Sequence, residues 1–354
     1  MIGGLAVLGL RCDTDLELLA KRLADRILGC GRLAQDVEHE HVAVPLEERG
    51  VGGKRLGGAR HGVDNSGCCT TMKLTSRYWA DHSARDFAHW RASGLVERIV
   101  AVLPLGATEQ HGPHLSCGVD TVLTEGVLRS ALSLVPADVP VLALPTLAVG
   151  LSPEHARFAG TLTLRSQTVL QLWTDIGESV AAAGVRKLLL FNGHGGHQGA
   201  LDLVARDLRA RCGLQVWWTS WMQLPLLDEH GQRHDWPFSA DEQRFGIHAG
   251  AIETSMMLAL APQQVDMTRA QRFGSQAEQR AQRGGLLGDG RSAKLGWQMQ
   301  DINLAGAAGD ASAASAEQGE RMVRGSARAL AQLLVEIHDS PSDTLNDHVD
   351  LGLG

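Results

Sequence analysis

Short apolar runs alternate with amphipathic stretches through most of this 354-residue chain, and this alternation limits its fold more than any other feature. The apolar runs cover residues 99–105, 139–145 and 185–191, and they are typical of strands buried on both faces of a sheet. Helical spacing of apolar residues marks the stretches 121–135, 166–183, 197–211, 249–260 and 314–338. Strands that alternate with helices predict a three-layer α/β/α fold with a mainly parallel central sheet. In such folds, ligands bind beyond the carboxyl ends of the strands.

The overall composition indicates which classes of binding partner the chain can have. With 44% hydrophobic residues and a formal net charge of −7, the chain lacks the basic surface that nucleic acid requires. It contains no run of about 18 uncharged apolar residues that could span a bilayer, and residues 1–10 lack the basic region of a secretory signal. We therefore expect a cytoplasmic protein that acts on a small molecule and binds neither nucleic acid nor membrane.

The first 71 residues differ from the rest of the chain. Residues 47–69 are rich in glycine and arginine and offer few apolar side chains to bury, which favours a loop or disorder. Residue 72 then opens a passage, MKLTSRYWADHSARDFAHW, that is typical of the start of a compact domain. We predict an N-terminal extension over 1–71 that is poorly ordered or not native, one domain over 72–340 and a C-terminal tail over 341–354.

Four side chains that can ligate metal follow two of the predicted strands. Glu109 and His111 come after the first strand, and their two-residue spacing in an extended segment places both on one side. Asp120 precedes the helix predicted from residue 121, and His194 lies in the tight turn after the strand 185–191. Taken singly, Asp120 would be a helix N-cap and His194 a turn residue. Together they indicate a site for Zn, Mn or Fe(II), because these ions accept carboxylate and imidazole ligands.

Four segments resemble the creatininase, or creatinine amidohydrolase, family, whose members include formamide hydrolases and a peptidase. They are LPLGATEQHGPHLSCGVDT, SPEHARFAGTL, LLLFNGHGGHQGAL and FGIHAGAIETSMML, in the family order within residues 76–335. The resemblance implies a creatininase-like fold and, in many members, a homohexamer. It also implies that Glu109, His111, Asp120 and His194 ligate two divalent ions per chain, with Asp120 bridging them.

One ligand of creatininase proper is missing from this chain. That enzyme has a glutamate ligand two residues after the histidine of the turn, whereas this sequence has Gly196. Glu253 is the candidate replacement, as a metal ligand or a catalytic group, because the segment HAGAIET accompanies an NGHGG turn in the family. The alternative is that Glu253 only interacts favourably with the dipole of its own helix. The resemblance assigns proton transfer to His248, against the alternative that His248 caps or packs.

Three further residues are predicted to contact substrate. Glu154 and His155 follow the second predicted strand and so reach the same edge of the sheet. Arg244 stands four residues before His248, where creatininase has a tryptophan, and would meet an anionic or phosphorylated substrate. The alternative for Arg244 is a solvated place on the surface. The segment 217–221, WWTSW, is interpreted as core and subunit interface.

These residues predict a metal-dependent amidohydrolase that cleaves a non-peptide C–N bond in a cyclic amide or a formamide. The two ions would activate the attacking water and polarise the carbonyl, and His248 would donate a proton to the leaving nitrogen. One alternative is a peptidase of the same family that acts on a modified peptide. Others are a single-metal non-haem iron oxygenase and a purely structural metal site, neither of which needs this many oxygen ligands. We expect a homo-oligomer, and a hexamer if the chain follows most of its family.

Overall fold

A parallel sheet of four strands forms the centre of the computed structural model, which describes residues 74–347, 349 and 351. The strands are β1 (Val100–Leu105), β2 (Val141–Ala143), β3 (Lys187–Asn192) and β4 (Gln215–Ser220), in the order β2-β1-β3-β4. The register pairs Val100 of β1 with Val141 of β2 and with Lys187 of β3. Strands β1 and β3 are buried along their whole length, which explains their apolar composition. The predicted extension over residues 1–71 lies outside the described residues.

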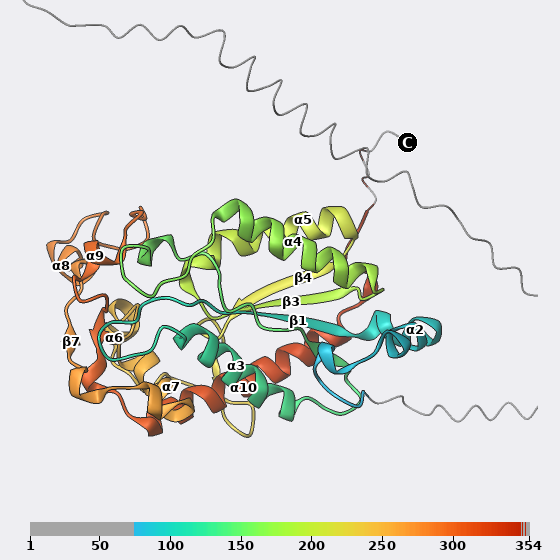
Figure 1. Cartoon of the computed structure of the whole chain (residues 1–354), viewed down its shortest axis with the longest axis horizontal. Helices are drawn as coiled ribbons and strands as arrows, with labels where there is room; N and C mark the ends of the chain where they lie inside the picture. The colour runs from blue at the N-terminus through green and yellow to red at the C-terminus, as the bar shows by residue number, and fades with distance from the viewer. Residues whose placement is uncertain (1–73, 348, 350, 352–354) are drawn as a thin grey trace, which may run out of the picture. The chain divides into compact units, whose positions relative to one another are not determined.

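Helices cover both faces of this sheet (Figure 1). Val100 and Val102 of β1 pack into one apolar cluster, while Ala101 and Leu103, which alternate with them, pack into another. The first cluster contains residues of α3 (Val119–Leu134), α7 (Ala251–Leu260) and α10 (Ala316–Asp339). The second contains residues of α4 (Ser166–Ala182) and α5 (Gln198–Cys212), with Trp90 of α2 (Ala84–Ser93). This arrangement confirms the three-layer α/β/α fold expected from the sequence.

Helices α7 and α10 pack against each other through a glycine. A Cβ atom at Gly319 of α10 would lie 1.8 Å from the carbonyl oxygen of Ser255 in α7, so no larger residue fits without displacing a backbone. The two helices are also joined by a hydrogen bond from the backbone N–H of Ser315 to Ser255 Oγ, 3.1 Å long. This contact sets the position of α7, whose first turn carries Glu253.

Smaller elements follow β4 along the chain. The short helices are α6 (Ala240–Phe245), α8 (Gln276–Arg283) and α9 (Met299–Ile302), and two short antiparallel pairs join β5 (Leu226–Leu227) to β6 (Arg233–His234) and β7 (Arg272–Phe273) to β8 (Gly309–Asp310). Single 3₁₀ turns cover Trp79–Asp81, Leu95–Arg98, Pro153–His155, Gly195–His197, Pro262–Gln264, Met267–Arg269, Ala311–Ala313 and Ser342–Thr344. Helices α6, α8 and α9 lie on the side of the sheet away from α2 (Figure 1). Because β1 runs from α2 toward them, they lie beyond the carboxyl ends of the strands, where ligands bind in such folds.

The structure adds elements that the periodicity did not indicate. The segment WWTSW, interpreted as core and subunit interface, begins inside β4, where Trp217 and Trp218 are half-buried on an edge strand.

Helix α10 ends at Asp339, next to the predicted boundary of the domain, and the carbonyl of Pro341 accepts a hydrogen bond from Gln215 Nε2. None of the helices among the described residues combines the length and the apolar character that a membrane span requires.

Candidate metal centre

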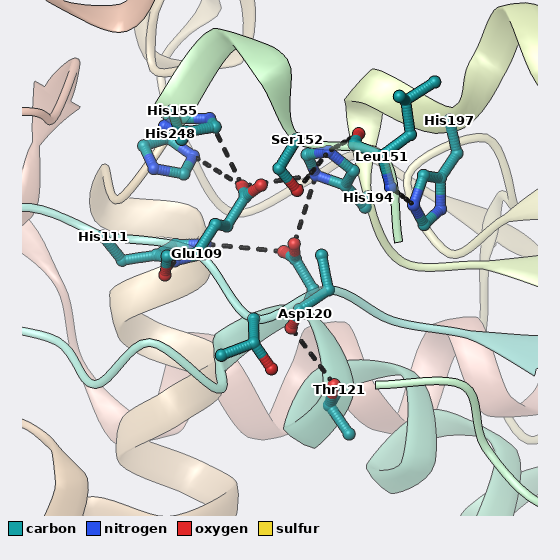
Figure 2. Close-up of polar contacts among 12 residues, drawn as sticks. Glu109, His111, Asp120, Thr121, Leu151, Ser152, His155, His194, His197 and His248 are labelled. Carbon is teal, nitrogen blue, oxygen red and sulfur yellow. Dashed lines mark hydrogen bonds and ion pairs between the residues drawn. The ribbon is translucent and has the colours of Figure 1, made fainter. Parts of the chain in front are cut away.

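Five acidic and histidine side chains meet beyond the carboxyl ends of β1 and β3. Glu109 and His111 lie in the loop after β1, Asp120 is the second residue of α3, His194 precedes the turn after β3, and Glu253 is the third residue of α7. All five are at least nine-tenths buried. Figure 2 shows Glu109, His111, Asp120 and His194 pointing toward one another from these separate segments. The structure thus brings together all five residues that the sequence reasoning assigned to metal.

The first donor group is defined by the contacts of His194 Nδ1 and consists of Glu109, Asp120 and His194. Nδ1 of His194 lies 3.2 Å from Glu109 Oε1 and 3.2 Å from Asp120 Oδ2. The other nitrogen of the same ring, Nε2, lies 3.0 Å from the carbonyl oxygen of Leu151 and therefore carries the proton. Nδ1 then presents a lone pair to two carboxylate oxygens, an arrangement that is repulsive unless a cation or a proton lies between them.

The second donor group consists of His111, Asp120 and Glu253, each of which offers one ligand atom within 4.8 Å of the other two. His111 Nε2 lies 3.4 Å from Asp120 Oδ1 and 3.9 Å from Glu253 Oε2. His111 Nδ1 donates to the backbone carbonyl of Glu109 over 2.9 Å, so Nε2 presents its lone pair to the carboxylates. Asp120 therefore offers one oxygen to each group, as expected for a bridging ligand.

The hydrogen bonds of these atoms support a metal site. Both carboxylate oxygens of Glu109, Nε2 of His111 and Oδ2 of Asp120 are buried and accept or donate no hydrogen bond among the described residues. Buried polar atoms in native proteins are almost always satisfied. Four unsatisfied atoms directed at one another, all of types that Zn, Mn or Fe(II) accepts, fit the divalent ions expected from the sequence.

The charges of the cluster favour positive charge at its centre. Burial lowers the pKa of His111, but the nearby carboxylates of Asp120, Glu253 and Glu109 outweigh burial and raise that pKa to about 9. Burial also lowers the pKa of His194, and Glu109 and Asp120 reverse this and hold it well above its ordinary value. For Glu253, burial itself raises the pKa to about 7, and the charge of Asp120 adds to this effect despite the opposing charge of His111. The site therefore attracts a proton or a metal ion.

The carboxylate of Glu154 lies beside the ring of His194, outside both donor groups. Its Oε1 is 3.2 Å from His194 Nε2, the nitrogen that also donates to Leu151. A Cβ atom at Gly196 would lie 2.1 Å from this same oxygen, so the glycine leaves the space that the Glu154 carboxylate occupies. Glu109, Glu154 and His194 can each bring a donor atom within 4.8 Å of the others. Glu154, however, faces Nε2 of His194, whereas Glu109 faces Nδ1. We therefore assign to Glu154 the orientation of the His194 ring.

Replacing Glu154 with Ala should weaken metal binding by about 10-fold to 100-fold, the usual effect of removing the partner of a metal-bound histidine. Glu154→Gln retains an acceptor for His194 Nε2 and should retain most of the affinity. Calorimetric titration of the metal-free protein with Mn²⁺ measures both effects. Equal affinities for the Ala variant and the unaltered protein would rule out the orienting role.

Two further histidines face Glu109, and Gln110 fixes their orientation. Gln110 Oε1 accepts from the backbone N–H of Gly112, so its amide nitrogen donates to His155 Nδ1 over 2.8 Å. His155 therefore carries its proton on Nε2, 3.3 Å from Glu109 Oε1. His248 shows the opposite arrangement, because its Nε2 donates to the backbone carbonyl of Gln110 over 2.7 Å and its unprotonated Nδ1 lies 3.8 Å from Glu109 Oε1. Figure 2 shows both rings on the same side of Glu109.

Arg244 does not reach this cluster. Its side chain is exposed, lies over the ring of its neighbour Phe245 at 4.8 Å, and donates to the carbonyl of Gly288 over 3.4 Å. It lines a separate cavity bounded by α6, α8 and the segment 287–297. A contact between Arg244 and substrate stays a prediction, and it would involve a part of the substrate away from the reacting bond.

Sequence reasoning missed the two residues that orient the ligand loops. One is Gln110, described above. The other is His197, which is fully buried and connects Asn192 Oδ1, 2.8 Å from its Nδ1, to the backbone N–H of Leu151, 3.1 Å from its Nε2. Asn192 in turn bonds the backbone of His194 at both its N–H and its carbonyl. His197 belongs to the motif NGHGGH, but only the fold shows that this histidine connects two loops.

Comparison with known proteins identifies relatives of this chain. The family model described as creatininase, creatinine amidohydrolase, matches residues 88–334. The mycofactocin precursor peptide peptidase of Mycobacterium tuberculosis is 37% identical over 174 residues, which are 48% of this chain and 61% of that relative. The creatinine amidohydrolase of Pseudomonas putida is 31% identical over 191 residues, which are 48% of this chain and 67% of that enzyme.

Solved structures agree with these matches. The crystal structure of a creatinine amidohydrolase (creatininase) superposes with a TM-score of 0.59 at 25% identity, covering 76% of this chain and 100% of that chain. The similarity to the peptidase spans less than two thirds of that protein. The matched family region, in contrast, extends over the central sheet and includes every residue of both donor groups. This chain belongs to the creatininase family.

Proposed function

We propose that this chain hydrolyses an amide C–N bond with a water activated at two divalent ions. One observation carries the proposal: the two oxygens of Asp120 face different donor groups, with His194 near one oxygen and His111 near the other. A carboxylate shared by two cation sites is the arrangement expected of a two-metal hydrolase. When bound, Zn, Mn or Fe(II) ions supply a water of lowered pKa and polarise the carbonyl that is attacked.

The residues of this chain would manage the protons of the reaction. Burial and the nearby charges of His111 and His155 hold the pKa of His248 well below its ordinary value, which favours the neutral ring. Its unprotonated Nδ1 faces Glu109, so we assign to His248 the acceptance of a proton from the attacking water. The same proton then passes to the departing nitrogen, which leaves readily only as a protonated amine. His155, with its Nε2–H 3.3 Å from Glu109 Oε1, would stabilise the charge of that carboxylate.

Two classes of amide substrate are considered. A free cyclic amide or a formamide is the class predicted from the motifs. An amide within a modified peptide is the alternative, and two observations favour it. The M. tuberculosis peptidase is 37% identical over 174 residues, against 31% over 191 residues for the P. putida creatinine amidohydrolase. In addition, Gly196 and Arg244 stand where creatininase proper has a glutamate ligand and a tryptophan. We therefore favour a peptide-derived substrate.

Metal removal tests the proposal. Protein dialysed against a chelator should lose all amide hydrolysis, and addition of about two equivalents of Mn²⁺ or Zn²⁺ should restore it. Elemental analysis should count about two ions per chain in the loaded protein, and release of amine should be followed with a lactam, an N-formyl amino acid and short peptides. One ion per chain with oxygen consumption would instead support the single-metal oxygenase. Full hydrolysis in metal-free protein would refute both.

A further inference from the structure

A large cavity lies between the end of α6, helix α8 and the segment 287–297. Its volume is about 840 Å³, within the range of pockets that hold small ligands or short peptide segments. Trp297, Phe245 and Leu295 contribute apolar surface to its lining. Leu295 is 61% exposed, so part of this surface faces solvent rather than the core.

The charges in the cavity lining are mostly positive. Four cations line it, and they are Arg244, Arg280, Arg291 and Lys294. Within residues 74–347, none of the four forms an ion pair with a carboxylate at 4.0 Å or less. The acidic lining residue, Asp289, is already bonded to the hydroxyl of Ser292 and to two backbone N–H groups. In a chain of net charge −7, this excess of four cations over one carboxylate is suited to a negatively charged ligand.

Two connections join the cavity to the metal centre. Phe245 lies three residues before His248, so their Cα atoms are at most about 11 Å apart. On the other wall, Trp297 packs in a cluster with Ala308, whose backbone N–H and carbonyl both bond to His248. The next residue, Gln298, donates to the carbonyl of Pro153, which begins the turn that carries Glu154 and His155. About three to four residues of extended peptide would cover this span.

We propose that this cavity binds an acidic segment of a peptide substrate, a few residues from the amide that the metal centre hydrolyses. The proposal rests on the peptide branch of the proposed function. Aspartate or glutamate side chains of the substrate would face the arginine and lysine side chains, and the apolar residues between them would pack on Trp297. Arg244 would then meet an anionic group of the substrate at a distance from the reacting bond rather than at it.

Two peptides test this recognition by binding alone. They are octapeptides with the same fluorophore, identical except that two central aspartates in one are asparagines in the other. In 25 mM salt, fluorescence anisotropy with the full-length, metal-loaded protein should show about 10-fold or more tighter binding of the acidic peptide. The preference should fall to about two-fold or less in 250 mM salt, where the screening length drops below 10 Å. Equal binding of the two peptides in low salt would overturn the proposal.

Charge reversal locates the effect in the cavity. Arg280→Glu with Lys294→Glu should abolish the preference, whereas Arg85→Glu, which reverses an exposed charge on α2, should leave it intact. Lys294 is exposed and Arg280 half-buried, and neither makes a side-chain bond within residues 74–347, so the double variant should fold as the unaltered protein does. Survival of the preference in the double variant, or its loss together with a change of oligomeric state on a sizing column, would overturn the proposal. Preferential binding without cleavage of any peptide would leave the cavity assignment standing and count against the proposed peptidase activity.

Discussion

Asp120→Asn is expected to remove both of the proposed metal ions and to lower kcat/KM by about 1,000-fold or more, equivalent to about 4 kcal/mol of transition-state stabilisation. The amide has nearly the same shape as the carboxylate but no charge, and both donor groups lose their shared anion at once. Elemental analysis and the amine-release assay measure the two losses separately. A variant with an unchanged count of two ions would show that Asp120 does not bridge them.

The matched control for this variant lies on the same helix. Glu125→Gln makes the same chemical change on α3 but removes a half-buried carboxylate outside the donor groups. It should leave the metal content and kcat/KM within about two-fold of the unaltered protein. An equal loss in both variants would indicate damage to α3 rather than loss of a ligand.

Gly319→Val is expected to lower the free energy of unfolding by about 3 kcal/mol or more, at the upper end for an overpacked core. The new side chain would meet the carbonyl oxygen of Ser255 at 1.8 Å, and neither helix backbone can yield without separating α10 from α7. Urea denaturation gives the change in stability. Because α7 carries Glu253, the surviving folded protein should also bind its second ion more weakly.

A glycine in open space provides the comparison for Gly319. Gly199 lies in the first turn of α5, is exposed, and has no atom within 4 Å of a built Cβ. Gly199→Ala should therefore raise stability slightly, by about 0.5 to 1 kcal/mol, because alanine favours the helix. If Gly319→Val were as well tolerated as Gly199→Ala, the close helix contact would not exist in solution.

Apolar periodicity was enough to predict the layers of the fold and the origin of most ligands. The runs over 99–105 and 185–191 became the buried strands β1 and β3, because central strands of a parallel sheet need apolar residues on both faces. The edge strand β4 was missed, because Trp217 and Trp218 are half-buried and its apolar run is only three residues long. Helices α6 and α8 are short and polar, so their sequences show little periodicity.

Site residues could be predicted from the sequence where the residue type and its place after a strand are enough to indicate the role. Glu109, His111, Asp120 and His194 were found in this way, since carboxylates and imidazoles after strands indicate metal. Roles that depend on which ring nitrogen faces a neighbour could not be foreseen. Glu154 and His155 lie next to each other in the sequence, yet one lies beside His194 and the other beside Glu109. Such roles follow from hydrogen bonds between loops more than 40 residues apart.

The two donor groups do not depend equally on the rest of the molecule. Glu109, Asp120 and His194 all follow or adjoin β1 and β3, the strands with neighbours on both sides, which in most domains are the last to open. The other group needs Glu253, and so it is complete only when α7 lies against α10 at Gly319. The two ions should therefore bind in order, the first to a frame already built by the central strands. Uptake of the second would then report the docking of a helix rather than the formation of the sheet.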